Sequence, residues 1–186
     1  MSILIKNGRV IDPANQRDEV LDILIEQDKI SKVAKNIKCP VDTIIDAADK
    51  VVIPGLVDLH VHLREPGRED KETVSSATMA AAKGGLTSVL AMPNTSPAMD
   101  SAENIRLLQG IIKKTARINV FICGAITKER LGKDLTDISR LKAAGAVAIS
   151  DDGASVNDEK LLFEALKKAK DAKLLVSCHS EDKILS

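Results

Sequence analysis

The fold is decided by one segment of the sequence, PGLVDLHVHLREP at residues 54–66. Its apolar part, residues 56–60, follows a Pro-Gly pair and is typical of a buried strand. His60 and His62 lie two positions apart at the carboxyl end of that strand, so their side chains point to the same face. Because zinc accepts neutral imidazole nitrogen, the pair is a candidate metal site. For the pair alone, two loop histidines without a ligand role remain the alternative.

After residue 54 the sequence repeats the order strand, loop, helix. Further strands are predicted at four aliphatic runs, 87–92, 118–123, 146–150 and 174–178. Helices are predicted between the strands, at 71–83, 102–115, 137–144 and 159–172. Five strands alternating with four helices predict a parallel α/β sheet with right-handed crossovers. Two closures are open: a complete doubly wound sheet, or the first five strands of a (β/α)8 barrel, which needs roughly 200–250 residues.

The first 53 residues differ from the rest because they hold only short β-prone runs. These runs lie at 2–5, 9–11, 20–26, 29–34, 43–46 and 51–53. Asn7-Gly8 predicts a tight hairpin turn, and Gln27-Asp28 predicts a second turn. We therefore expect a small β domain at residues 1–53, arranged as a sheet or partial sandwich, and a β/α unit at residues 54–186.

The third histidine and a pair of aspartates follow two other predicted strands. His179 comes directly after the strand at 174–178, and Asp151-Asp152 comes directly after the strand at 146–150. The carboxyl ends of parallel strands meet at one rim, which is the functional face of a barrel. Two acidic residues before glycine also suit an ordinary turn. Beside three histidines on the same rim, we favour a ligand role for one of these carboxylates.

Two further polar residues are expected near this rim. Arg64 lies two residues beyond His62, and a guanidinium binds carboxylates with two parallel hydrogen bonds. Asn94 follows the strand at 87–92 and can both donate and accept. Each of these residues, taken alone, also suits a surface or turn position.

The composition excludes several classes of protein. Charged residues make up 29% and the formal net charge is zero, which argues against a nucleic-acid binder and a polybasic membrane anchor. The three cysteines are isolated and odd in number, so we expect no disulfide framework. The sequence shows neither a signal peptide nor a membrane-spanning run of about 18 apolar residues. We expect a cytoplasmic protein without nucleic-acid or membrane partners.

Four blocks of the sequence resemble a known family in the same order. They are residues 54–67, AMPNT at 91–95, SDDG at 150–153 and HSED at 179–182. The first block resembles the dihydroorotase signature of the amidohydrolase superfamily, and the later blocks are similar to type I dihydroorotases. The resemblance implies an α/β fold: a (β/α)8 TIM-type barrel, here with its first five strands, preceded by a small β-sandwich domain built from both chain ends.

The resemblance also implies a set of metal ligands. His60 and His62 would bind one zinc ion and His179 a second, which gives one or two zinc ions per subunit. Alignment of the third block places the bridging carboxylate on Asp152, with Asp151 as the less favoured candidate.

The implied reaction is the reversible cyclisation of N-carbamoyl-L-aspartate to dihydroorotate in pyrimidine biosynthesis. Arg64 and Asn94 would hold the carboxylate of this substrate, together with His62. The family takes another zinc histidine and its catalytic aspartate from later strands, which would lie beyond Ser186. We therefore expect residues 1–186 to be a fragment without turnover of its own. We also expect a homo-oligomer, with an aspartate transcarbamoylase as a partner that the resemblance allows.

Two alternatives to a dihydroorotase are kept. Hydantoinases and allantoinases belong to the same superfamily, but many such relatives bridge their metals with a carboxylated lysine on the fourth strand, and residues 146–150 contain no lysine. The other alternative is a non-catalytic dihydroorotase-like subunit that scaffolds a transcarbamoylase. Such proteins usually lose metal ligands, so the three rim histidines count against it.

Overall fold

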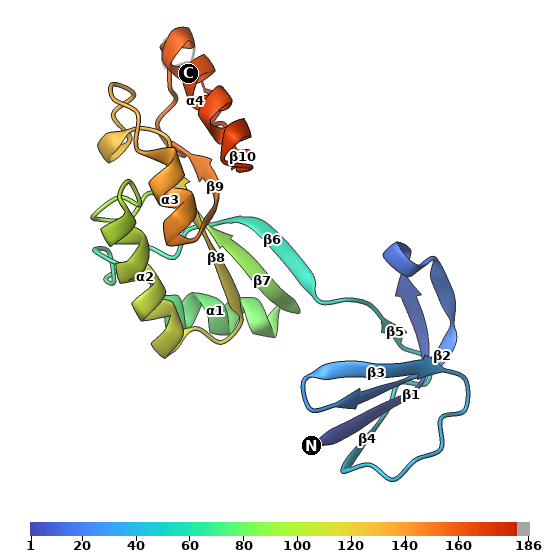
Figure 1. Ribbon diagram of the computed structural model, residues 1–186. Coiled ribbons are helices and arrows are strands. Elements are labelled where there is room, and N and C mark those ends of the chain that lie inside the picture. Colours follow the sequence, from blue (N-terminus) through green and yellow to red (C-terminus); the bar gives the residue numbers. More distant parts are fainter. Residues whose placement is uncertain (182–186) are drawn as a thin grey trace. The chain divides into compact units, whose positions relative to one another are not determined.

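A computed structural model describes residues 1–181 of the protein. The chain divides into two compact units, Met1–Pro54 and Gly55–Ser186, and each is described by itself. Figure 1 shows strands and a short 3-10 turn in the first unit, and alternating strands and helices in the second. Among the described residues, no helix has both the length and the apolar character that a membrane crossing requires.

The N-terminal unit is built on one five-stranded sheet. Its strands are β1 (Ser2–Asp12), β2 (Arg17–Glu26), β3 (Lys29–Ala34), β4 (Thr43–Asp46) and β5 (Val51–Val52). The strand order is β3-β2-β1-β4, and β5 also pairs with β1. The β1–β2 and β2–β3 pairs are antiparallel, whereas β4 and β5 run parallel to β1. The predicted turn at Gln27-Asp28 is confirmed, since Glu26 pairs with Lys29 across it.

The prediction of a hairpin turn at Asn7-Gly8 is wrong. Both residues lie inside β1, where the pairing with β2 shifts register between Ile5 and Gly8, so the pair forms a β-bulge. Asn7 has the left-handed φ of 62° that an Asn-Gly turn signal favours, but the chain continues in the same direction. The chain reverses later, at the 3-10 turn Pro13–Asn15.

A buried aspartate on β2 explains why the bulge is stable. Asp22 accepts hydrogen bonds from the Asn7 backbone amide (3.0 Å), the Ile37 backbone amide (2.9 Å) and Lys6 Nζ (3.1 Å). Burial acts to raise the pKa of Asp22, but these hydrogen bonds outweigh it and lower the pKa below its ordinary value. The side chain therefore ties the bulge to the segment after β3.

The C-terminal unit contains a parallel sheet whose strands follow one another in chain order. The strands are β6 (Leu56–Val61), β7 (Leu86–Ala91), β8 (Asn119–Ala125), β9 (Ala146–Ser150) and β10 (Leu175–Val176). Each strand pairs in parallel with the next one along the chain. A doubly wound sheet reverses its strand order at one point, whereas a barrel does not. The order therefore identifies a half-barrel of the TIM type, as predicted.

Helices connect these strands and each begins at a polar cap. They are α1 (Val74–Lys83), α2 (Ala102–Thr115), α3 (Ile138–Ala144) and α4 (Glu159–Asp171). The capping side chains belong to Thr73, Ser101, Asp137 and Asp158, and each accepts a backbone amide of the first helical turn. Ile105 and Leu108 of α2 are fully buried against the sheet, beside Ile122 of β8. Helices α1, α2 and α3 lie along one face of the sheet, which leaves its strand ends to carry the site (Figure 1).

Candidate metal centre

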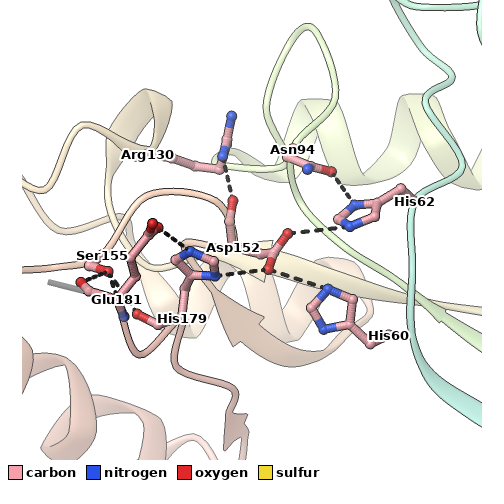
Figure 2. A network of polar contacts seen from close by, with 8 residues as sticks. All are labelled: His60, His62, Asn94, Arg130, Asp152, Ser155, His179 and Glu181. Carbon is pink, nitrogen blue, oxygen red and sulfur yellow. Dashed lines mark hydrogen bonds and ion pairs between the residues drawn. The ribbon is translucent and has the colours of Figure 1, made fainter. Parts of the chain in front are cut away.

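Polar side chains from three strand ends converge at the carboxyl rim of the half-barrel. His60 lies within the last residues of β6, and His62 follows directly after that strand. Asp152 lies two residues beyond the end of β9, and His179 lies three residues beyond the end of β10. Figure 2 shows the three imidazole rings turned toward the Asp152 carboxylate.

The distances from Asp152 to the three imidazoles suit metal ligands better than direct hydrogen bonds. His60 Nε2 lies 3.3 Å and His179 Nδ1 3.5 Å from Asp152 Oδ1, and His62 Nε2 lies 3.6 Å from Asp152 Oδ2. Charge-assisted hydrogen bonds are shorter, about 2.7–2.9 Å. Ligands around a tetrahedral zinc with bonds of about 2.0–2.1 Å are separated by roughly 3.3–3.4 Å. The ligand atoms of His60, His62 and Asp152, which all lie within 4.8 Å of one another, therefore fit one zinc-like ion. His179 is not part of that group and approaches it through Asp152.

Two of the histidines have a second partner that fixes which nitrogen faces Asp152. His62 Nδ1 lies 3.0 Å from Asn94 Oδ1, and because a carbonyl oxygen only accepts, Nδ1 carries the proton. His179 Nε2 lies 2.8 Å from Glu181 Oε2, which assigns the proton to Nε2 in the same way. The lone pairs of His62 Nε2 and His179 Nδ1 are then free for a cation, an arrangement usual around metal-binding histidines.

The two adjacent aspartates have different environments. Asp151 Oδ1 accepts the Ile126 backbone amide (2.7 Å) and the Thr127 backbone amide (3.1 Å), and its Oδ2 accepts the Thr127 hydroxyl. Burial raises the pKa of Asp151, and these hydrogen bonds oppose the rise without cancelling it. Asp151 thus holds the segment after β8, and Asp152 is the member of the pair that faces the histidines.

The segments that carry Asp152 and His179 are fixed by two side chains that the sequence did not single out. Arg130 Nη1 donates to the Asp152 carbonyl oxygen at 2.6 Å. The Ser155 hydroxyl donates to the carbonyl oxygens of His179 and Glu181, at 2.8 and 2.6 Å. Glu181 lies two residues from His179 within the fourth resemblance block, so its position could have been noticed. The contact of Arg130 spans 22 residues and leaves no local signal.

The remaining predicted residues are placed as follows. Asn94 contacts His62, so it belongs to the centre. Arg64 lies in the loop after β6 with a left-handed φ of 62°, and within residues 1–181 its guanidinium makes no hydrogen bond or ion pair. Its role in binding a substrate stays a prediction. Asp182, the last residue of the fourth resemblance block, lies outside the described residues.

Comparisons with known proteins place the chain in a family. Residues 49–186 match the family model described as dihydro-orotase-like. Over its full length the chain is 52% identical to a dihydroorotase from Elusimicrobium minutum, and over 98% of its length it is 48% identical to one from Geotalea daltonii. In each case it covers 43% of the relative, so the chain spans less than half the length of these curated proteins.

Solved structures share the fold. An L-hydantoinase (dihydropyrimidinase) from Arthrobacter aurescens matches with a TM-score of 0.86 at 20% identity, over 98% of this chain and 41% of that one. A D-hydantoinase from Thermus sp. matches with a TM-score of 0.76 at 26% identity, again over 98% and 41%. A dihydroorotase matches with a TM-score of 0.69 at 19% identity, over 97% of this chain and 51% of that one. With a family model matching most of its residues, the chain belongs to the dihydro-orotase-like family.

Proposed function

We propose that the full-length protein carrying this chain is a zinc-dependent dihydroorotase, which interconverts N-carbamoyl-L-aspartate and dihydroorotate. The observation that carries the proposal is the convergence of three imidazoles on the Asp152 carboxylate at 3.3–3.6 Å. Dihydroorotases with 44–52% identity supply the reaction and the substrate class. Residues 1–186 alone are proposed to have no turnover.

The proposed metal ligands are His60, His62, Asp152 and His179. His62 would bind through Nε2 and His179 through Nδ1, because their other ring nitrogens contact Asn94 and Glu181. Asp152 has one oxygen near His60 and His179 and the other near His62, so either oxygen could hold zinc beside these histidines. Zinc in such a site activates water and polarises the amide carbonyl of the substrate.

Arg64 and Asn94 are proposed to bind the substrate carboxylate, beside His62. The Oδ1 atom of Asn94 already accepts from His62, so the amide Nδ2 is the group that can donate to a substrate. The Arg64 guanidinium, without a polar partner in the described part of the chain, is able to form a bidentate pair with a carboxylate. Proton transfer at the leaving nitrogen is assigned to a carboxylate outside this chain.

A hydantoinase-like activity is the second candidate, because hydantoinases match this fold with TM-scores up to 0.86. That likeness, at 20% identity, concerns the fold. The residues oppose the candidate, since β9 holds no lysine that could be carboxylated, and Asp152 occupies the central position instead. The scaffold alternative is opposed by the four converging side chains, because a non-catalytic subunit has no use for them.

The test is metal analysis of the purified full-length protein together with turnover of three ring substrates: dihydroorotate, hydantoin and allantoin. We expect bound zinc and a preference for dihydroorotate of about 100-fold or more over the other rings. Zinc with preferred turnover of hydantoin or allantoin would assign the second candidate. A metal-free and inactive protein would assign the scaffold role.

A further inference from the structure

We propose that Arg130 is a positioning residue of the metal centre, which holds the Asp152 carboxylate among the histidines by binding the Asp152 main chain. The inference rests on the zinc site of the proposed function, and nothing in the sequence pointed to this residue. Figure 2 shows the Arg130 side chain reaching the Asp152 carbonyl oxygen, while the three imidazoles lie around the Asp152 carboxylate.

The contact fixes the peptide that carries Asp152. Arg130 Nη1 donates to the Asp152 carbonyl oxygen at 2.6 Å, a short bond from a charged donor. The next residue, Gly153, has a φ of 76°, a left-handed conformation that turns the chain sharply. A bond to the carbonyl oxygen holds the plane of the Asp152–Gly153 peptide, and so sets the direction in which the Asp152 side chain leaves the backbone.

The backbone around Arg130 is held in an unusual conformation. Glu129 and Arg130 have φ values of 53° and 58°, a region that residues other than glycine rarely adopt. Hydrogen bonds maintain it: the Glu129 amide donates to Asp100 Oδ2 at 2.8 Å, and the Arg130 amide to the Thr127 carbonyl oxygen at 3.1 Å. Strained backbone of this kind is concentrated at functional sites, where the surrounding structure enforces it.

The same loop binds the neighbouring aspartate from another direction. Ile126 and Thr127, a few residues before Arg130, donate their amides to the Asp151 carboxylate at 2.7 and 3.1 Å. The loop therefore fixes Asp151 by its side chain and Asp152 by its carbonyl oxygen. Of the two carboxylates, only that of Asp152 is left to face the histidines, which is the division that a metal ligand needs.

Charge and burial point to the same role. Asp151 and Asp152 are 2% and 6% exposed, so two adjacent carboxylates lie out of water, and Arg130 supplies a positive charge beside them. The Arg130 Nε atom is itself buried, and in the described part of the chain it has no hydrogen-bond partner. An unmatched buried donor is rare and unfavourable. Its presence indicates that the position of Arg130 is set by the Nη1 contact.

The test compares Arg130→Met, which keeps the length of the side chain, with Arg130→Lys, which keeps the charge. Arg140→Met, an exposed arginine of α3, is the matched control. Zinc affinity of the full-length protein is measured by competition with a chromophoric chelator, and the cobalt-substituted proteins are compared by their visible absorption spectra. We expect R130M to bind zinc about 10–100-fold more weakly, with an altered cobalt spectrum, as for lost outer contacts at other metal sites.

R130K is expected to show a smaller loss in the same direction, and R140M to match the unaltered protein. Zinc affinity and a cobalt spectrum that stay unchanged in R130M would overturn the inference. If R130M does not fold, an unchanged affinity and spectrum in folded R130K would overturn it equally. A parent protein that binds no zinc would instead refute the proposed function, so the two failures are distinguishable.

Discussion

Asp22 in the N-terminal unit and Asp152 in the C-terminal unit are both buried aspartates, with 3% and 6% exposure, but their surroundings are opposite. The Asp22 carboxylate accepts hydrogen bonds from two backbone amides and one ammonium group. The Asp152 carboxylate, within residues 1–181, has only imidazole nitrogens as polar neighbours, and at distances longer than good hydrogen bonds. The hydrogen-bonding needs of the Asp22 carboxylate are met by donors, whereas the Asp152 carboxylate is surrounded by potential metal ligands.

The two aspartates show two ways in which a buried carboxylate can be accommodated. A buried carboxylate is stable where donors replace its lost hydration, as around Asp22. Imidazoles whose protons are directed to Asn94 and Glu181 present lone pairs to Asp152, which a cation would bind and which would otherwise repel the carboxylate. Two adjacent residues can differ in this way. The Asp151 carboxylate accepts hydrogen bonds from backbone amides, as Asp22 does, whereas the next residue, Asp152, faces the imidazoles.

The largest effect is expected at Asp152. Replacing it with alanine removes the proposed metal ligand beside the three imidazoles, so we expect turnover of dihydroorotate by the full-length protein to fall about 1,000-fold or more, with loss of bound zinc. The folded state of the metal-free protein should change little, because no hydrogen bond to this carboxylate is lost. Asp151→Ala is the contrasting variant and should destabilise the metal-free protein. Full zinc content in D152A would show that the Asp152 carboxylate is not a metal ligand.

Asp22→Ala should have the reverse pattern. The substitution leaves the buried Ile37 amide and the partly buried Asn7 amide without an acceptor, and we expect a loss of about 3 kcal/mol in unfolding free energy. Zinc content and turnover at low temperature should match the unaltered protein. Denaturant unfolding measures the loss, with Asp18→Ala as the control at an exposed aspartate of the same strand. An unchanged midpoint in D22A would show that the donors around Asp22 contribute nothing.

Asn94 offers a way to separate its two proposed contacts. Asn94→Asp keeps an acceptor for His62 but replaces the amide donor with a negative charge. We expect zinc content to be retained, and KM for dihydroorotate to rise about 10–100-fold through repulsion of the substrate carboxylate. Asn94→Ala loses both contacts and should lower zinc affinity as well. Equal effects of the two variants on zinc would argue that Asn94 does not orient His62.

The strand pattern and the rim histidines could be predicted because their signals are local. Aliphatic runs between glycine or proline mark parallel strands, and the predicted strand at 146–150 coincides with β9 (Ala146–Ser150). Helix α1 begins three residues later than predicted, at Val74, because Thr73 forms a capping box with Ser76. His60, His62, Asp152 and His179 meet because a parallel sheet brings its carboxyl ends together, which follows from topology alone.

The features that escaped prediction depend on contacts between distant residues. Asn7-Gly8 favours a left-handed backbone in a turn and in a bulge alike, and Asp22, fifteen residues away, decides between them. The different environments of Asp151 and Asp152 are set by Ile126 and Arg130, more than twenty residues earlier. No local pattern of residue types records such pairings.

The smallest expected effect is a pH dependence confined to the N-terminal unit. The folded-state pKa of Asp22 lies below its ordinary value of about 3.9, so the ionised carboxylate stabilises the fold above that pH, and the stabilisation is lost as the pH falls through the folded-state pKa. We expect hydrogen exchange at the Asn7 and Ile37 amides to accelerate, after correction for intrinsic rates, as the pH falls below about 4. In Asp22→Asn the acid-induced acceleration should disappear, because the amide does not titrate, while the amides of β9 should respond alike in both proteins. An acceleration that persists in D22N would show that another group, not the Asp22 carboxylate, causes the acid sensitivity of these amides.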